Sequence, residues 1–130
     1  MELRHVYYTV KVVEDQQKFL CFKWEDNIYQ FTCLLNGIFE GPTIFTKLVK
    51  PVFASLRGKG YSITSFIDDT LICNKSKTGC LACVNDSILQ RLCFCINVGK
   101  SVLKPTKSIE YLGSIIDTNN MTILYLNAGF

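Results

Sequence analysis

Asp68 and Asp69 are adjacent carboxylates that lie between two short apolar runs, residues 66–67 and 71–72. Neighbouring like charges raise each other's pKa unless a cation neutralises them. Two roles stay open for such a pair: an ordinary turn whose side chains bond backbone amides, or a site for a hard divalent cation. Mg²⁺ prefers carboxylates together with substrate phosphates. The pair is therefore the first candidate for chemistry on phosphates.

The cysteines are the second candidate, and there are seven of them. An odd number, behind an N-terminus without a basic and then apolar leader, favours reduced thiols in an intracellular protein. Cys80, Cys83, Cys93 and Cys95 have the pairing of a four-thiolate zinc site. A helix over residues 78–95 would, however, hold the two pairs about 15 Å apart. We expect small buried hydrophobes and no structural zinc, with a zinc-stabilised interaction domain as an alternative.

Composition sets the frame for these candidates. The chain has 130 residues, 48% of them hydrophobic, and a formal net charge of +3. This fits one domain with one core and excludes a disordered tail or a supercharged nucleic-acid arm. Apolar runs are too short to span a bilayer. We expect a cytoplasmic or nuclear protein that is not secreted and has no membrane partner; the oligomeric state is left open.

The first half of the chain predicts strands followed by a helix. Residues 6–13 are β-branched and aromatic and predict a strand, and residues 19–24 and 28–34 predict a hairpin. A helix is predicted from Gly41-Pro42 to the glycines after residue 57. The apolar stripe expected on that helix consists of Ile44, Leu48, Val52 and Leu56.

The second half predicts a hairpin over residues 61–73 with both aspartates at its turn, and then the cysteine-rich helix. A loop carrying Lys100, Lys104 and Lys107 follows, and residues 109–116 and 121–126 predict a last hairpin. The predicted class is α+β: an antiparallel sheet with two helices on one face. Basic residues without an acid between positions 41 and 67 suit either a polyanionic partner or a solvated helix face.

Five segments in this order resemble the motifs of reverse transcriptases. Phe66-Ile67-Asp68-Asp69 is similar to the family's aromatic-x-Asp-Asp signature, and the other four segments are Glu2 to Tyr8, Tyr29 to Phe45, Gly99 to Ser101 and Tyr111 to Gly113. The sequence of residues 29–56 is most similar to that of retrotransposon enzymes of the DIRS type. The resemblance implies a polymerase palm with a fingers-stub hairpin and a primer-grip-like hairpin at the C-terminal end.

The resemblance also implies that residues 1–130 are a single partial reverse transcriptase domain, without the upstream fingers and the thumb. Asp68, Asp69 and Glu2 would hold two Mg²⁺ ions for phosphoryl transfer. Lys100 would protonate the leaving pyrophosphate; the alternative for this lysine is a solvated charge. The implied partners are an RNA or DNA template-primer and deoxynucleotides.

Three more residues are implied to contact the nucleotide. The Tyr7 ring would exclude a ribose 2′-hydroxyl, with core packing as its alternative role. Asn36 and Gly37 would touch the incoming nucleotide and the template, and a plain turn is the alternative for them.

Departures from the family pattern lead us to expect a degenerate or truncated fragment that is inactive alone. Glu2 stands where the family has aspartate, Leu35 stands where it has proline, and Glu2 is expected to fray as a terminal residue. A non-catalytic module that binds single-stranded nucleic acid through exposed aromatic residues is a further alternative.

Overall fold

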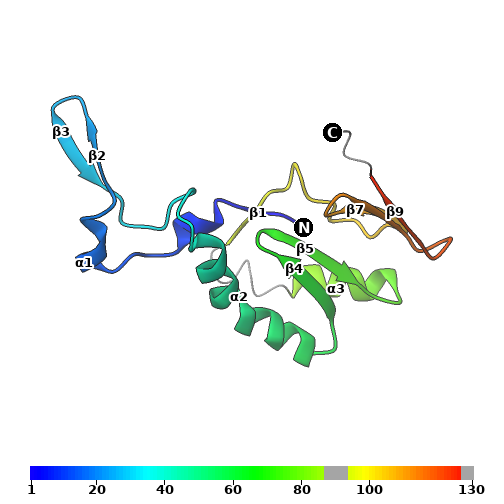
Figure 1. Cartoon of the computed structure of the whole chain (residues 1–130). Helices are drawn as coiled ribbons and strands as arrows, with labels where there is room; N and C mark the ends of the chain where they lie inside the picture. Colours follow the sequence, from blue (N-terminus) through cyan, green and yellow to red (C-terminus); the bar gives the residue numbers. More distant parts are fainter. Residues whose placement is uncertain (87–93, 127–130) are drawn as a thin grey trace.

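The computed structural model describes residues 1–86 and 94–126. Its elements in chain order are β1 (Leu3–Arg4), the 3₁₀ helix η1 (Val6–Thr9), α1 (Glu14–Gln17), β2 (Cys21–Trp24), β3 (Asn27–Gln30), α2 (Gly41–Gly58), β4 (Ser62–Phe66), β5 (Asp69–Cys73), α3 (Lys77–Asn85), β6 (Cys95–Ile96), β7 (Ser108–Tyr111), β8 (Ser114–Asp117) and β9 (Thr122–Tyr125). The β2–β3 hairpin lies at one end of the molecule and β7–β9 at the other, with α2 and β4–β5 between them (Figure 1).

The helix α2 supplies much of the core, and its predicted existence and limits are confirmed. The predicted apolar stripe is confirmed at Leu56, which is fully buried, and at Val52, which packs against the core. It is wrong at Ile44 and Leu48, which are exposed, because the helix buries Phe45, Val49 and Phe53 instead. Two apolar stripes run side by side on this helix. The one with two phenylalanines has the larger apolar area to bury against β1, β4 and α3, and it faces the core.

The predicted hairpin over residues 61–73 is confirmed as the antiparallel pair β4–β5, in which Phe66 pairs with Asp69. The turn therefore consists of Ile67 and Asp68, and Asp69 is the first residue of β5. Next to β5 lies the start of the chain, because Glu2 forms an antiparallel bridge with Asp69. The strand β1, which follows Glu2, pairs in turn with β6. Segments far apart in sequence thus meet around Asp69.

The strand predicted over residues 6–13 is wrong. His5 has a left-handed backbone with φ of 53°, which ends β1, and a 3₁₀ turn follows. The Thr9 hydroxyl donates a 2.6 Å hydrogen bond to the Val6 carbonyl and closes this turn. The polar residues 14–17 form the short helix α1. Local side-chain bonding prevails here over β propensity.

The predicted strand over residues 109–116 is folded in two. Leu112 and Gly113 have φ of 49° and 73°, and they form a two-residue turn between β7 and β8. With β9 these strands make a three-stranded antiparallel sheet instead of the predicted hairpin. The helix predicted over residues 78–95 is also wrong at its end: α3 ends at Asn85 and Cys95 lies in β6. Residues 87–93 are outside the described part.

Mixed helices and small antiparallel sheets confirm the predicted α+β class. Within the described residues, the structure has no helix that is both long and apolar enough to cross a membrane.

Candidate active site

The candidate site forms where β1 meets the β4–β5 turn. The Leu3 amide donates a 2.9 Å hydrogen bond to the Asp68 carbonyl, and the Thr70 amide donates one of 2.8 Å to the Met1 carbonyl. These bonds flank the bridge between Glu2 and Asp69. Directly paired residues of antiparallel strands have their Cβ atoms about 4.5–5.5 Å apart. The backbone thus brings Glu2 beside the aspartate pair.

Glu2 is held from its other side as well. Its amide donates a 2.9 Å hydrogen bond to the Ser101 Oγ, and its carbonyl accepts one of 2.9 Å from the Asn97 amide. The expectation that Glu2 frays is therefore wrong. Hydrogen bonds to β5 and to the loop after β6 fix its backbone on both sides.

The Glu2 side chain is turned towards that loop. Its Oε1 accepts a 3.3 Å hydrogen bond from Asn97 Nδ2 and lies 3.8 Å from Lys100 Nζ. Glu2 is mostly buried, whereas the Lys100 side chain is 71% exposed. The structure therefore brings the candidate lysine to the acids, but as a partner of Glu2.

The aspartate pair has no such partner. Within the described residues, neither Asp68 nor Asp69 accepts a side-chain hydrogen bond or forms an ion pair. Partial burial raises the pKa of Asp69 above its ordinary value of 3.8, and the charges of Asp68 and Glu2 raise it further. The ammonium of Met1 and, to a smaller extent, Lys100 oppose this effect only in part. The site is thus a cluster of negative charge that its own cations leave incompletely balanced.

The turn that presents the aspartates has an unusual backbone. Ile67 has φ of 53°, a left-handed conformation that β-branched residues rarely adopt. Such strain costs on the order of 1–3 kcal/mol and is found mostly at functional sites. Ile67 is held in place because its side chain packs against the core.

Metal-binding geometry is a separate question from charge. Among residues 1–86 and 94–126, no three His, Cys, Asp or Glu side chains are close enough together to hold a metal ion. In this structure the backbone of Glu2 therefore lies beside that of the aspartates, but the three side chains do not converge as the ligands of one ion.

Tyr7 lies in η1, not in the predicted strand. Its ring is half-buried and packs edge-on against Phe45, with the ring centroids 6.1 Å apart and the planes at 89°. It also borders the first turn of α2, because a Cβ built on Gly41 would lie 3.8 Å from Tyr7 Cε1. Core packing, the alternative named for this residue, is thus present.

Asn36 and Gly37 form an exposed turn before α2. Gly37 has φ of 94°, so this turn requires glycine. The structure gives neither residue a side-chain contact with the acids. Of the predicted site residues, it therefore gathers Glu2, Asp68, Asp69 and Lys100 and leaves this turn apart.

Three neighbours of the acids were missed. Asn97 and Ser101 bond Glu2, and Tyr111 is near enough to Asp69 for that charge, after burial, to raise its pKa. Ser101 and Tyr111 lie in segments that resemble family motifs, so these segments could have indicated both residues as neighbours of the acids. No sequence signal indicated Asn97.

The cysteines divide into different environments. Cys83 is fully buried in the core, Cys80 is half-buried and Cys95 is exposed on β6; Cys93 lies outside the described residues. The expectation of a small buried hydrophobe is confirmed for Cys83. The distance argument against zinc does not hold, because residues 78–95 are not one helix. The absence of structural zinc stays a prediction, for which metal analysis of the purified chain is the test.

The family model for reverse transcriptase (RNA-dependent DNA polymerase) matches residues 1–116. The chain belongs to the reverse transcriptase family. A search of curated proteins gave no match.

Solved structures similar to this chain come from foamy viral protease-reverse transcriptase. One, in complex with double-stranded DNA, has a TM-score of 0.80 at 21% identity over 91% of this chain and 20% of that one. Another, with an RNA/DNA hybrid, has a TM-score of 0.75 at 20% identity over 90% and 16%. A third, with double-stranded DNA, has 0.77 at 20% over 92% and 24%. The chain thus spans about a fifth of these proteins, and the likeness shows the fold.

Proposed function

We propose that this chain is the palm segment of a retroelement reverse transcriptase, which extends a DNA primer on an RNA or DNA template. The observation that carries the proposal is the bridge between Glu2 and Asp69. It places the acid of the first motif beside the aspartate pair of the hairpin turn. In-line phosphoryl transfer depends on positioning and electrostatic stabilisation, and neighbouring carboxylates would hold the ions that supply the stabilisation.

The donor set of this site fits a hard divalent cation. All three candidate side chains offer carboxylate oxygens, the ligands that Mg²⁺ prefers, and Mg²⁺ usually takes one or two of them together with substrate phosphates. Burial raises the pKa of Asp69 most, and a cation would relieve the repulsion by Asp68 and Glu2 that raises it further. In this proposal Asp68, Asp69 and Glu2 would hold two Mg²⁺ ions, which would supply electrostatic stabilisation to the transferred phosphoryl group.

The remaining residues position the substrates. Tyr7, fixed edge-on by Phe45, presents a rigid ring that excludes a ribose 2′-hydroxyl. Asn36 and Gly37 contact the incoming deoxynucleotide and the template. Lys100, whose ammonium is exposed 3.8 Å from Glu2, donates a proton to the leaving pyrophosphate.

We further propose that the 130 residues do not polymerise DNA by themselves. Asn97 and Lys100 engage the Glu2 carboxylate, and its extra methylene relative to aspartate displaces the oxygens. A misplacement of about 1 Å at a reacting centre costs on the order of a hundredfold in rate. Because the chain matches only about a fifth of its structural relatives, contacts to triphosphate and template-primer would come from other segments.

Primer extension on an RNA template with Mg²⁺ tests the second proposal. We expect no product from the native chain or from the Asp68→Ala variant. Extension by the native chain that disappears in Asp68→Ala would refute inactivity and leave the site assignment standing. Recovery in a longer chain carrying fingers, thumb and Glu2→Asp would support both.

Iron-promoted backbone cleavage tests the metal site without requiring activity. Fe²⁺ in place of Mg²⁺, with ascorbate and peroxide, should cleave the chain near residues 67–70, and Asp69→Asn should abolish the cut. The matched control is Asp26→Asn, which removes an exposed aspartate at the turn of the β2–β3 hairpin. Cleavage spread evenly along the chain, or unchanged in Asp69→Asn, would contradict metal binding by these acids.

A second candidate function is metal-independent binding of single-stranded nucleic acid. The observation that favours it is the exposure of Phe22, Trp24 and Tyr29 on the β2–β3 hairpin, because bases stack on exposed aromatic rings. Fluorescence anisotropy with a labelled oligonucleotide should then show binding that EDTA does not change and that Trp24→Ala weakens. Binding that requires Mg²⁺ and survives Trp24→Ala would favour the palm assignment.

A further inference from the structure

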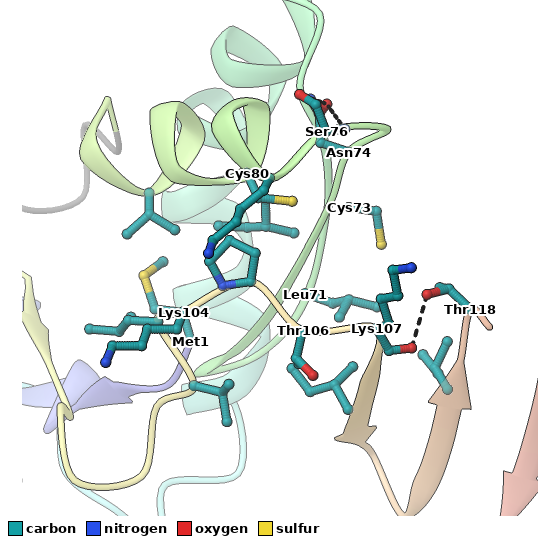
Figure 2. A pocket seen from close by; sticks show the side chains of 18 of the residues that line it. Met1, Leu71, Cys73, Asn74, Ser76, Cys80, Lys104, Thr106, Lys107 and Thr118 are labelled. Atoms are coloured by element: carbon teal, nitrogen blue, oxygen red, sulfur yellow. Dashed lines mark hydrogen bonds between the residues drawn. The ribbon is translucent and has the colours of Figure 1, made fainter.

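A cavity of about 460 Å³ lies between β5, α3, the loop of residues 102–107 and the β7–β8 pair (Figure 2). We name it the β5 cavity. None of the four gathered site residues, Glu2, Asp68, Asp69 and Lys100, lines it. Its volume is in the range of small-molecule pockets, about 300–1,000 Å³. It is therefore large enough for a bound organic molecule and separate from the acids.

The wall of the β5 cavity is mainly apolar. Leu71 comes from β5, Val84 from α3, and Ile109 and Ile116 from the β7–β8 pair. Apolar side chains from three separate elements converge there. Such a lining favours an aromatic or aliphatic body over a fully hydrated ion.

Positive charge surrounds this apolar wall. Four lysines line the cavity, and no acidic residue is among its described lining residues; the lysines are Lys75, Lys77, Lys104 and Lys107. All four are exposed, so their stems can line the wall while their ammonium groups meet solvent. Within the described part of the chain, none of them forms an ion pair. The cavity therefore presents uncompensated positive charge at its solvent side.

We propose that the β5 cavity binds an amphipathic organic anion, with its apolar body against the wall and its anionic group among the lysines. The charge of the lining selects an anion, and the apolar wall selects an organic one. This site is independent of the polymerase assignment, because its residues and its test involve no catalytic step.

The test uses two fluorescent probes with the same aromatic body. The anion is 1-anilinonaphthalene-8-sulfonate, and the neutral control is N-phenyl-1-naphthylamine, which lacks the sulfonate. We expect the anion to bind more tightly than the neutral probe. Lys104→Gln/Lys107→Gln should weaken the anion roughly fivefold, in line with exposed ion pairs, and leave the neutral probe unchanged. The charge-matched control, Lys47→Gln/Lys50→Gln on α2, should change neither.

Cysteine alkylation locates the bound probe. Cys73 and Cys80 line the cavity, whereas Cys21 is exposed on the β2–β3 hairpin. The anionic probe should slow iodoacetamide labelling of Cys73 and Cys80 and leave Cys21 unchanged, as read by mass spectrometry.

Three results would overturn the proposal. They are protection of Cys21 together with Cys73 and Cys80, equal affinity for the anionic and neutral probes, and an anion affinity unaffected by the loss of Lys104 and Lys107.

Discussion

The hairpins β2–β3 and β4–β5 have turns of the same kind but lie in different surroundings. Each has a two-residue loop: Glu25-Asp26 in the first and Ile67-Asp68 in the second. The first loop residue has φ of 53° in both, and an aspartate follows it in both. As local structures the two turns are nearly the same.

Their environments are opposite. Every strand residue of β2–β3 is exposed, whereas β4–β5 buries Ile63 and Thr70 and bonds the start of the chain. An acidic turn therefore does not by itself make a site. The β4–β5 turn becomes a candidate because another strand brings Glu2 to it and the core holds its strained backbone.

Truncation of a buried strand residue should give the largest difference between the hairpins. Ile63 is 5% exposed in β4 and Ile28 is 76% exposed in β3. We expect Ile63→Ala to lower the free energy of unfolding by about 2–4 kcal/mol and Ile28→Ala to change it by less than about 0.5 kcal/mol. Urea denaturation followed by circular dichroism measures both. Similar losses in the two variants would mean that β2–β3 is packed against something in solution.

The exposed hairpin should also open before the body of the molecule. Trp24 is the only tryptophan of the chain and lies in β2, and a two-stranded hairpin without core contacts is marginally stable. Tryptophan fluorescence should therefore change at a urea concentration below the main transition seen by circular dichroism. Coincident transitions would show that β2–β3 unfolds together with the core.

Sequence patterns predicted the elements whose ends are set by nearby residues. The proline and glycines at the ends of α2, and the polar loops of β2–β3 and β4–β5, gave elements that the structure confirms. The site acids could be named because the family motifs set them in order. Register within α2 was not predictable, because two adjacent apolar stripes satisfy the same helical period.

Other features depend on contacts that no local pattern contains. The left-handed His5 ends β1 where β propensity predicts its continuation. The role of Asn97 follows from a contact across 95 residues of sequence. The turn at Leu112-Gly113 was a missed local signal, because glycine in a strand pattern commonly marks a break.

Replacing the first turn residue by glycine should change the stability of the two hairpins differently, but by less than the truncations do. Glycine relieves the left-handed strain in both, worth on the order of 1 kcal/mol. Glu25→Gly has no packing to lose and should slow hydrogen exchange of the β2–β3 amides. Ile67→Gly also loses the contact of its side chain with the core, so its stability should be unchanged or lower. A stabilised Ile67→Gly would show that this packing contributes little.

The smallest expected effect concerns the pH dependence of stability at Asp69. Its pKa in the folded chain is raised above 3.8, through burial first and then through the charges of Asp68 and Glu2. Below 3.8 the carboxyl is protonated in both states and carries no penalty. As the pH rises through the folded pKa, the folded chain must ionise a group that the unfolded chain ionises freely, so stability is lost.

Asp69→Asn removes this penalty, so the variant should be more stable than the native chain at pH 7, and the gain should fade as the pH falls towards 3.8. Solvent screening of a half-exposed carboxylate keeps the gain small. Urea midpoints at several pH values measure it, and Asp26→Asn in the exposed hairpin corrects for the loss of one negative charge. A gain that grows towards acid pH, or one that Asp26→Asn reproduces, would show that the repulsion around Asp69 is not what distinguishes the two turns.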